Sequence, residues 1–396
     1  MIFVVIDGLG DRGDKTPLSE AYKPNLNELA SRGMNGLVDV IAPGIVPGSD
    51  TGHLALFGYD PFKYYPGRGV FEALGAGLEL KEGDIAFRAN FATIKDGKIV
   101  DRRAGRFGSD ELAKELNMEI DGVKVIVKRT TGHRCAVIFR PKEEKLSSKI
   151  SDCDPKKVGV EAPACQPLDN SEEAKRTAEI VNKFIKEAHR ILSDHPINIE
   201  RRNEGKLEAN YILLRGAGEY RKVESFKERW GLKAACVAGG AMYKGVAKYL
   251  DFKIIEVKGA TADENTDLKA KAEAALKALE NHDFVFVHVK ATDTFGHDGN
   301  FEGKKWMIER IDKELISEFL SCEYITVTSD HSTPVLIKRH SSDPVPIVIC
   351  GEGVRRDDVD KFDEFSASKG ILCRIRGTDI VPIITDLLNK YRMFGT

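Results

Sequence analysis

The stretches FVFVHVKATDTFGH at residues 284–297 and YITVTSDH at residues 324–331 decide the fold, because each joins an apolar, strand-like run to metal-ligand side chains. The first stretch carries Asp293 and His297, and the second ends in an Asp-His pair. In an open α/β sheet, ligand sites collect beyond the carboxyl ends of the strands. The two stretches therefore predict strands of one sheet whose ends share a site.

Further candidate ligands lie on both sides of these stretches. Asp7 follows the apolar run IFVVI, Ser49 lies in PGSDTGH, and His340 closes KRH. The complete set holds three carboxylates, three imidazoles and one hydroxyl: Asp7, Ser49, Asp293, His297, Asp330, His331 and His340. Such a set suits two divalent metals and a serine nucleophile.

Each of these residues also has a simpler interpretation. Asp7 precedes a glycine and fits a turn, Ser49 is a favoured helix N-cap, and His340 follows two basic residues of a loop. Their joint order favours the functional interpretation. Oxygen and imidazole ligands suit Mn²⁺, Zn²⁺ or Mg²⁺, and the histidine-rich set favours Mn²⁺ or Zn²⁺.

Composition excludes several classes of protein. The chain has 396 residues, 42% of them hydrophobic, and a net charge of -2, so no overall field attracts it to nucleic acid or to a membrane. No run approaches the roughly 18 apolar residues of a membrane helix, and the N-terminus lacks a signal sequence. Seven cysteines without a CxxC pair predict reduced thiols in the cytoplasm.

Strand-like and helical patterns alternate over much of the chain, which predicts βαβ units and an α/β fold with a mostly parallel sheet flanked by helices. The expected strands are 2–6, 253–257, 284–289, 324–328 and 345–350, and the expected helices are 24–32, 264–281, 303–320 and 379–391.

The middle of the chain follows a different pattern. Residues 75–215 contain short strand-like pieces separated by polar turns, followed by a helical pattern over 171–192. We expect an inserted α+β domain at 75–215, placed between the two parts, 1–74 and 216–396, of the metal-binding domain. A cleft between two domains is a common place for a small-molecule site.

Several motifs together resemble a known family. VIDGLGDR, PGSDTGHLALFGYDP, GRGVFEALGAG, FRANFAT, DRRAGR, SDCDP, NYILLRGAG, HVKATDTFGHDGN and TSDHSTP span nearly the whole chain. They are similar to motifs of the alkaline phosphatase superfamily and, more closely, of its cofactor-independent phosphoglycerate mutases of the archaeal type. The resemblance implies an alkaline-phosphatase-like core with an inserted substrate-binding domain.

The resemblance also implies roles for the ligands. One metal would be held by Asp293, His297 and His340, and the other by Asp7, Ser49, Asp330 and His331. Ser49 would be the nucleophile that becomes phosphoserine. The metals would be Mn²⁺ or Zn²⁺, with Mg²⁺ and Co²⁺ as alternatives, and no 2,3-bisphosphoglycerate would be needed.

Substrate contacts are expected from the insertion. The resemblance implies that it binds glycerate, and Arg102, Arg103 and Arg215 are candidates because a guanidinium binds carboxylate or phosphate bidentately. Lys244 would help to hold phosphate. Each could instead be a surface cation. The sequence departs from the family pattern at Lys156, where a His is expected.

The implied activity is the interconversion of 3-phosphoglycerate and 2-phosphoglycerate, with domain closure keeping water from the phosphoserine. Asp101, Asp152 and Asp154 are all open as the acid or base. The alternatives are a metal-dependent phosphomonoesterase or another phosphomutase, such as a phosphopentose mutase. A silent binding protein on this fold would lack a ligand or the nucleophile, and neither is missing. A small-molecule substrate is the expected partner, and a homo-oligomer stays open.

Overall fold

The computed structural model describes residues 1–391, 393 and 395 and contains two compact units. Unit 1 comprises Met1–Tyr65 and the chain from Val223 onward, and unit 2 comprises Pro66–Lys222. The expected junctions at 74/75 and 215/216 differ from these limits. They fall at the end of one helix, α5 (Arg68–Gly75), and inside one strand, β8 (Tyr211–Glu219), and both elements pack within unit 2.

Unit 1 is built on an eight-stranded sheet in the order β10-β9-β11-β1-β12-β13-β2-β14. All neighbouring strands are parallel except β13, which is antiparallel to both β12 and β2. The strands are β1 (Ile2–Ile6), β2 (Met34–Asp39), β9 (Ala234–Val237), β10 (Lys253–Ile254), β11 (Phe284–Val289), β12 (Tyr324–Thr328), β13 (Val345–Gly351) and β14 (Cys373–Arg376). The prediction of an α/β fold with a mostly parallel sheet is confirmed.

Burial explains which strands could be predicted. Every residue of β1 and β11 is buried, as expected for central strands of a sheet covered on both faces, and such strands are continuous apolar runs. In contrast, β14 is short and mostly exposed, and β2 contains Asn35 and Gly36, so neither has a strand-like pattern. The strand expected at 253–257 is only two residues long.

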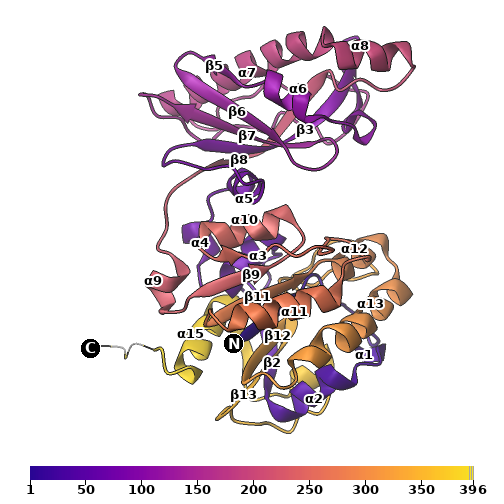
Figure 1. Ribbon diagram of the computed structural model, residues 1–396, viewed down its shortest axis with the longest axis vertical. Helices are drawn as coiled ribbons and strands as arrows, with labels where there is room; N and C mark the ends of the chain where they lie inside the picture. The colour runs from indigo at the N-terminus through magenta and orange to yellow at the C-terminus, as the bar shows by residue number, and fades with distance from the viewer. Residues whose placement is uncertain (392, 394, 396) are drawn as a thin grey trace. The chain divides into compact units, whose positions relative to one another are not determined.

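Helices cover the sheet of unit 1, with α11 and α13 crossing in front of it in the view of Figure 1. The helical segments of this unit are α1 (Pro17–Glu20), α2 (Pro24–Arg32), α3 (Ser49–Leu56), α4 (Pro61–Tyr64), α9 (Phe226–Trp230), α10 (Ala241–Tyr249), α11 (Leu268–Leu279), α12 (Ala291–Asp298), α13 (Phe301–Glu314), η2 (Ile316–Phe319), α14 (Glu364–Ala367) and α15 (Gly377–Leu387). The single helix expected at 303–320 is divided, because Leu315 leaves helical geometry and a short 3-10 turn follows.

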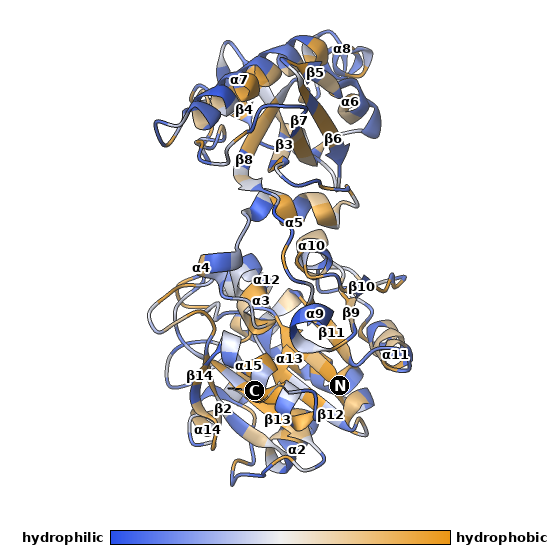
Figure 2. Cartoon of the chain, turned by 90° about the vertical axis from the view of Figure 1, so that its left-hand side faces the viewer, coloured by the Kyte–Doolittle hydropathy of each residue, from blue (hydrophilic) through white to orange (hydrophobic). Residues whose placement is uncertain are grey.

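Unit 2 is an antiparallel sheet with helices. Its strands run in the order β4-β3-β7-β6-β5, and β8 pairs with β3. The bounds are β3 (Ile85–Lys95), β4 (Lys98–Asp101), β5 (Met118–Ile120), β6 (Val123–Arg129) and β7 (Arg134–Pro141), with α6 (Asp110–Glu115), α7 (Glu172–Ser193), α8 (Pro196–Asn203) and the 3-10 turn η1 (Ala104–Arg106). Figure 2 shows the hydrophobic colouring of its central strands and the hydrophilic outer side of α7. Buried side chains of α7 and the sheet form one apolar core.

Among the described residues, no helix is both long enough and apolar enough to span a membrane.

Candidate metal centre

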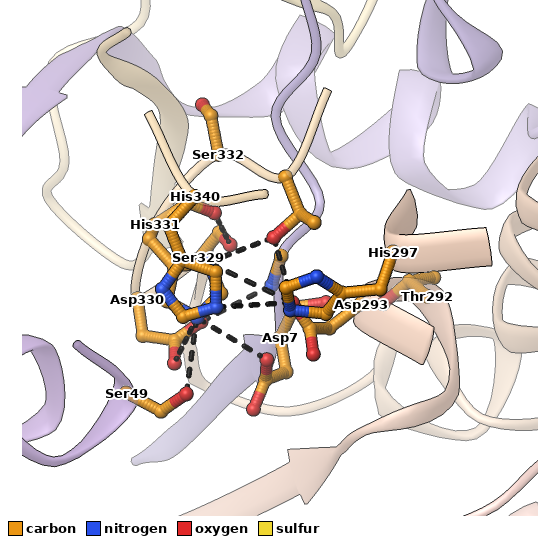
Figure 3. A network of polar contacts seen from close by, with 12 residues as sticks. Asp7, Ser49, Thr292, Asp293, His297, Ser329, Asp330, His331, Ser332 and His340 are labelled. Carbon is orange, nitrogen blue, oxygen red and sulfur yellow. Dashed lines mark hydrogen bonds and ion pairs between the residues drawn. The ribbon is translucent and has the colours of Figure 1, made fainter. Parts of the chain in front are cut away.

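Three neighbouring strands of unit 1 deliver most of the predicted ligands to one edge of the sheet. β11 and β12 lie on either side of β1, parallel and in register, with Ile6 opposite Val289 and Val5 opposite Thr328. Asp7 therefore leaves the sheet beside the Asp330–His331 pair on one side and the α12 turn on the other. The close-up in Figure 3 shows these side chains pointing toward one another.

Gly8 allows the chain to turn immediately after Asp7. Its φ of +64° lies in the left-handed region, and an added Cβ would lie 2.7 Å from the Cβ of Asp293 and 2.7 Å from the hydroxyl of Thr333. A side chain at this position would therefore push the site apart. The backbone N–H of Gly8 instead donates to Asp330 Oδ1 at 3.2 Å.

Ser49 is the first residue of α3 and does not cap the helix. Gly48 is the N-cap residue, and the hydroxyl of Thr51 accepts a hydrogen bond from Gly48 N at 3.0 Å. The capping interpretation of Ser49 is therefore wrong. The Ser49 hydroxyl is buried and lies 3.1 Å from His331 Nε2.

Four predicted ligands of one metal converge on a single point. His331 Nε2 lies 3.1 Å from Ser49 Oγ, 3.3 Å from Asp330 Oδ2 and 3.5 Å from Asp7 Oδ1. His331 Nδ1 lies 3.0 Å from the hydroxyl of Thr333, which fixes the ring. These four groups are the ones assigned above to the second metal.

The other predicted ligands converge on Asp293. Its Oδ1 lies 3.4 Å from His297 Nε2 and 3.5 Å from His340 Nε2. Each ring places its Nδ1 against a backbone carbonyl, Lys338 O for His297 at 3.1 Å and Pro47 O for His340 at 2.9 Å. Because a carbonyl only accepts hydrogen bonds, each Nδ1 carries the proton and each Nε2 keeps its lone pair for a ligand.

These spacings fit divalent cations. Metal–ligand distances of about 2.1 Å in a tetrahedral site separate the ligand atoms by roughly 3.4 Å. The donor atoms of Asp293, His297 and His340 lie within 4.8 Å of one another, as do those of Asp7, Asp293 and His331. Asp330 Oδ2 is buried and has no hydrogen-bond partner in the described chain, as expected for an oxygen atom that coordinates a cation.

Lys290 is the residue of this site that the sequence analysis missed. Its Nζ donates to Asp7 Oδ1 at 3.0 Å and also forms a close ion pair with Asp293, so it joins the carboxylates of both ligand groups. It lies in the stretch 284–297, three residues before Asp293, but a lysine does not belong to a ligand pattern of carboxylates and imidazoles.

The charges of the site shift its titrations. Burial alone would raise the pKa of Asp7, but Lys290 and the hydrogen bond from His288 outweigh it and hold that pKa well below its usual range. Burial, and then the negative charge of Asp7, raise the pKa of Asp330 far above the ordinary value. The three carboxylates therefore carry more negative charge than the single positive charge of Lys290 can neutralise.

Other buried groups contact the candidate ligands and fix their positions. His288 Nε2 lies 3.0 Å from Asp7 Oδ2, and the ring of Tyr243 stacks on His288 with centroids 3.6 Å apart. The Thr333 hydroxyl donates to Asp293 Oδ1 at 2.7 Å. His53 is fully buried, and its Nδ1 lies 2.7 Å from Ser49 O.

Lys244 is not brought to this cluster. Its Nζ forms an ion pair at 2.6 Å with Glu256, whose side chain is 76% exposed. Such an exposed partner is released at little cost.

The predicted arginines lie in unit 2 and differ in their surroundings. Arg102 makes a bidentate ion pair with Asp154, at 2.8 and 2.7 Å, and Arg215 NH1 lies 3.8 Å from the same carboxylate. Arg103 is exposed. Two of the three candidates therefore share one carboxylate.

Arg88, on β3, adds a further positive charge that the sequence analysis missed. It stands directly opposite Arg215 on β8, and the buried Nε atoms of both have no hydrogen-bond partner in the described chain. Burial lowers the pKa of Arg88 to about 10, against the attraction of Glu72, whose Oε1 lies 3.5 Å from Arg88 Nε, and with repulsion from Arg215 in the same direction as burial. Like charges that face each other across a ladder are destabilising, so this pair is suited to an anion. Arg88 belongs to the motif FRANFAT, which in the sequence indicated only a family resemblance.

The three candidate acids or bases are also in unit 2. Burial raises the pKa of Asp154, but the hydrogen bond and charge of Arg102, together with the Lys156 backbone N–H, outweigh it and lower that pKa, which disfavours Asp154 as a proton donor. Asp152 accepts from Gly216 N at 2.8 Å, and Asp101 accepts from Arg103 N at 2.6 Å. Asp101 and Asp152 both remain candidates.

Comparisons with known proteins place this chain among close relatives. The family model for 2,3-bisphosphoglycerate-independent phosphoglycerate mutase matches residues 30–198. Over the whole chain, the sequence is 52% identical to 2,3-bisphosphoglycerate-independent phosphoglycerate mutase 1 of Archaeoglobus fulgidus, covering 99% of that protein. It is 48% identical to the corresponding protein 1 of Methanocaldococcus jannaschii, covering 100% of this chain and 98% of the relative.

Solved structures agree with this similarity. The cofactor-independent phosphoglycerate mutase of Thermoplasma acidophilum is 40% identical with a TM-score of 0.74, covering 98% of each chain. A protein of Pyrococcus horikoshii is also 40% identical, with a TM-score of 0.86, covering 100% of this chain and 98% of that one.

Proposed function

The chain belongs to the 2,3-bisphosphoglycerate-independent phosphoglycerate mutases, and from this premise we propose that Ser49 carries the phosphoryl group while it moves between two oxygens of glycerate. The activity is the interconversion of 3-phosphoglycerate and 2-phosphoglycerate, an isomerase reaction of glycolysis and gluconeogenesis. The observation that carries the proposal is the position of Ser49 Oγ, buried within 3.1 Å of His331 Nε2 among the ligand groups.

The ligand set leads us to infer two divalent cations, Mn²⁺ or Zn²⁺. One would be held by Asp293, His297 and His340, and the other by Asp7, Ser49, Asp330 and His331. Bound there, the cations would neutralise charge on the phosphoryl group and lower the pKa of the Ser49 hydroxyl. Support comes from the two sets of ligand atoms, spaced 3.1–3.5 Å from His331 Nε2 and from Asp293 Oδ1.

In the proposed reaction, Ser49 Oγ attacks the phosphorus of 3-phosphoglycerate in line with the ester oxygen. The Oγ–P bond forms and the bond from phosphorus to the 3-oxygen breaks, while Oγ gives up its proton and the 3-oxygen takes one up, so that glycerate is left beside phosphoserine. Glycerate then reorients, and its 2-oxygen takes the phosphoryl group back from Ser49. No second phosphate donor is consumed, which agrees with a reaction independent of 2,3-bisphosphoglycerate. Most of the rate enhancement in phosphoryl transfer comes from positioning and electrostatic stabilisation.

We assign the glycerate carboxylate to the arginines of unit 2. Arg88 and Arg215 are the strongest candidates, because they face each other across the ladder and the buried Nε atom of each has no hydrogen-bond partner in the described chain. Arg102 is largely neutralised by Asp154, and Arg103, the most exposed of the four, is expected to contribute least. Lys244 could bind phosphate after releasing Glu256. A cytoplasmic setting is inferred from the seven free cysteines.

The experiment that tests this proposal supplies purified protein with Mn²⁺ and 3-phosphoglycerate, without 2,3-bisphosphoglycerate. It assays 2-phosphoglycerate and free phosphate in parallel, with Ser49→Ala alongside. We expect 2-phosphoglycerate with little free phosphate, and neither product from the variant. Free phosphate alone would contradict the mutase assignment and leave a metal-dependent phosphomonoesterase. Full mutase activity in Ser49→Ala would contradict the role of Ser49.

A further inference from the structure

Cys153 and Cys165 in unit 2 lie side by side in a segment that folds back on itself. Ile150 and Pro167 form an antiparallel bridge, Ser151 N donates to Gln166 O at 2.8 Å, and Gln166 N donates to Ser151 Oγ at 2.9 Å. This pairing places Cys165 beside the residues that immediately precede Cys153. Accordingly, Cys165 Sγ donates to Ser151 O at 3.5 Å.

The backbones of both cysteines are anchored to regular structure. Cys153 N donates to Leu214 O of β8 at 2.8 Å. Cys165 N donates to the side-chain oxygen of Asn182 in α7 at 2.8 Å, and the Asn182 amide donates back to Cys165 O at 3.0 Å. The approach of the two side chains is therefore set by the sheet and the long helix, and not by a freely moving loop.

The two thiols also belong to the same apolar core of unit 2. Each side chain is nearly fully buried. Their mutual hydrogen bond, together with burial, raises the pKa of Cys153, and the same hydrogen bond lowers the pKa of Cys165.

We propose that Cys153 and Cys165 are a redox pair that small-molecule disulfides convert reversibly into a disulfide bond. The Cys165 thiolate attacks one sulfur of the small disulfide, and the first small thiolate leaves. Cys153 Sγ then attacks Cys165 Sγ and displaces the second small thiol. Two protein S–H bonds are lost and one Sγ–Sγ bond forms, while the oxidant takes up two electrons and two protons and becomes two thiols.

The bond would close the loop of residues 154–164. This loop is exposed over most of its length, so its local opening gives the oxidant a route to Cys165. It also begins with Asp154, the carboxylate that holds Arg102 and lies 3.8 Å from Arg215. Oxidation would thus restrict the movement of Asp154. The effect of this restriction on substrate binding rests on the function proposed above.

Alkylation counting tests the pair without using activity. The native full-length protein is incubated with oxidised glutathione, quenched in acid, unfolded and treated with iodoacetamide. We expect five alkylated cysteines of the seven, and a cross-linked peptide that joins Cys153 to Cys165. Cys153→Ser should instead accumulate a glutathione adduct on Cys165, because the resolving thiol is missing. Cys373→Ser, which removes an exposed cysteine, should still form the bond.

Seven alkylated cysteines after oxidation would overturn the proposal, as would a bond that maps to any other two cysteines. Because the readout is a mass, failure here is separate from failure of the phosphoglycerate reaction.

Discussion

Two clusters of charge in this molecule, one buried and one partly buried, have opposite signs. In unit 1, Asp7, Asp293 and Asp330 meet, and Lys290 is the one lysine that the described residues pair with Asp7 and Asp293. In unit 2, Arg88 faces Arg215 across a β ladder. Buried charge is tolerated when it is paired, and each cluster holds an excess that its own side chains do not neutralise. One is therefore suited to cations and the other to anions, and metal ions and phosphoglycerate together supply both.

The clusters also differ in construction. Most candidate ligands of unit 1 follow the ends of in-register parallel strands, where the topology itself gathers them. The arginines of unit 2 stand on the face of an antiparallel sheet, where their meeting depends on strand register. Changes in the first cluster should therefore act on chemistry and metal binding, and changes in the second on substrate affinity.

The largest effect is expected from Ser49→Ala. Loss of the attacking oxygen should lower kcat by at least about 10⁴-fold, the scale seen when a nucleophile is removed. The measurement is steady-state mutase activity with Mn²⁺. The variant should still bind metal, because six other ligand side chains remain, and calorimetric titration with Mn²⁺ provides that control. A variant that loses both activity and all metal binding would contradict the separation of the two roles.

Metal removal should distinguish the two units. Cations that bind only the folded state add about 3–4 kcal/mol to the free energy of unfolding when free metal is roughly 100–1,000 times Kd. Chelation should therefore lower the Tm and increase hydrogen exchange around β11, α12 and the segment after β12.

Strands β6 and β7 of unit 2 provide the internal control for this experiment. Their exchange should not change when metal is removed. Equal loss of protection in both units, or an unchanged Tm after verified metal loss, would contradict a metal centre confined to unit 1.

Arg88→Met tests the anion cluster. Loss of this guanidinium should raise KM for 3-phosphoglycerate by about 100-fold, as expected when one partner of a buried charged contact is removed. The Tm should rise, because burial disfavours the charge of Arg88 and lowers its pKa to about 10. The matched control is Arg103→Met, an exposed arginine whose loss should change KM by a few-fold at most. A stable Arg88→Met variant with unchanged KM would refute the substrate role.

The smallest effect concerns Lys271, buried behind the metal centre, whose Nζ donates to His288 O at 3.0 Å. Burial lowers its pKa from 10.5 to about 8. Between these values the unfolded chain binds more protons than the folded protein, so this group makes the protein more stable as pH rises. The stability of the protein relative to Lys271→Met should increase with pH by at most about 1.4 kcal/mol per unit.

Chemical denaturation at pH 8 and pH 10, both in chelator, provides the measurement. A difference between protein and variant that stays constant across this range would show that Lys271 titrates normally.

The sequence predicted unit 1 better than unit 2, and the reason is physical. Asp7, Asp293 and Asp330 each follow an apolar strand, so a local pattern placed them at one sheet edge. Lys290 was missed because its role appears only once two carboxylates that are far apart in sequence come together. Arg88 was missed because nothing local shows that it stands opposite Arg215.

Local sequence patterns likewise did not predict the hydrogen-bond and ion-pair partners of individual side chains. Ser49 could have capped α3, but Gly48 is the N-cap residue, and the hydroxyl of Thr51 accepts a hydrogen bond from its N–H. Lys244 has a partner, Glu256, that sequence spacing did not indicate. The division of the expected 303–320 helix depends on the backbone at Leu315, which no residue type in that stretch signals.

The most direct test of the account is to trap the phosphorylated enzyme. Protein with Mn²⁺ is mixed with 3-phosphoglycerate, quenched in acid within a single turnover, digested and sequenced by mass spectrometry, with Ser49→Ala as the control. The account predicts one phosphoryl group on Ser49 in the active protein and none in the variant. Formation of 2-phosphoglycerate with the phosphoryl group on another residue, or with Ser49 unmodified at every time point, would contradict it.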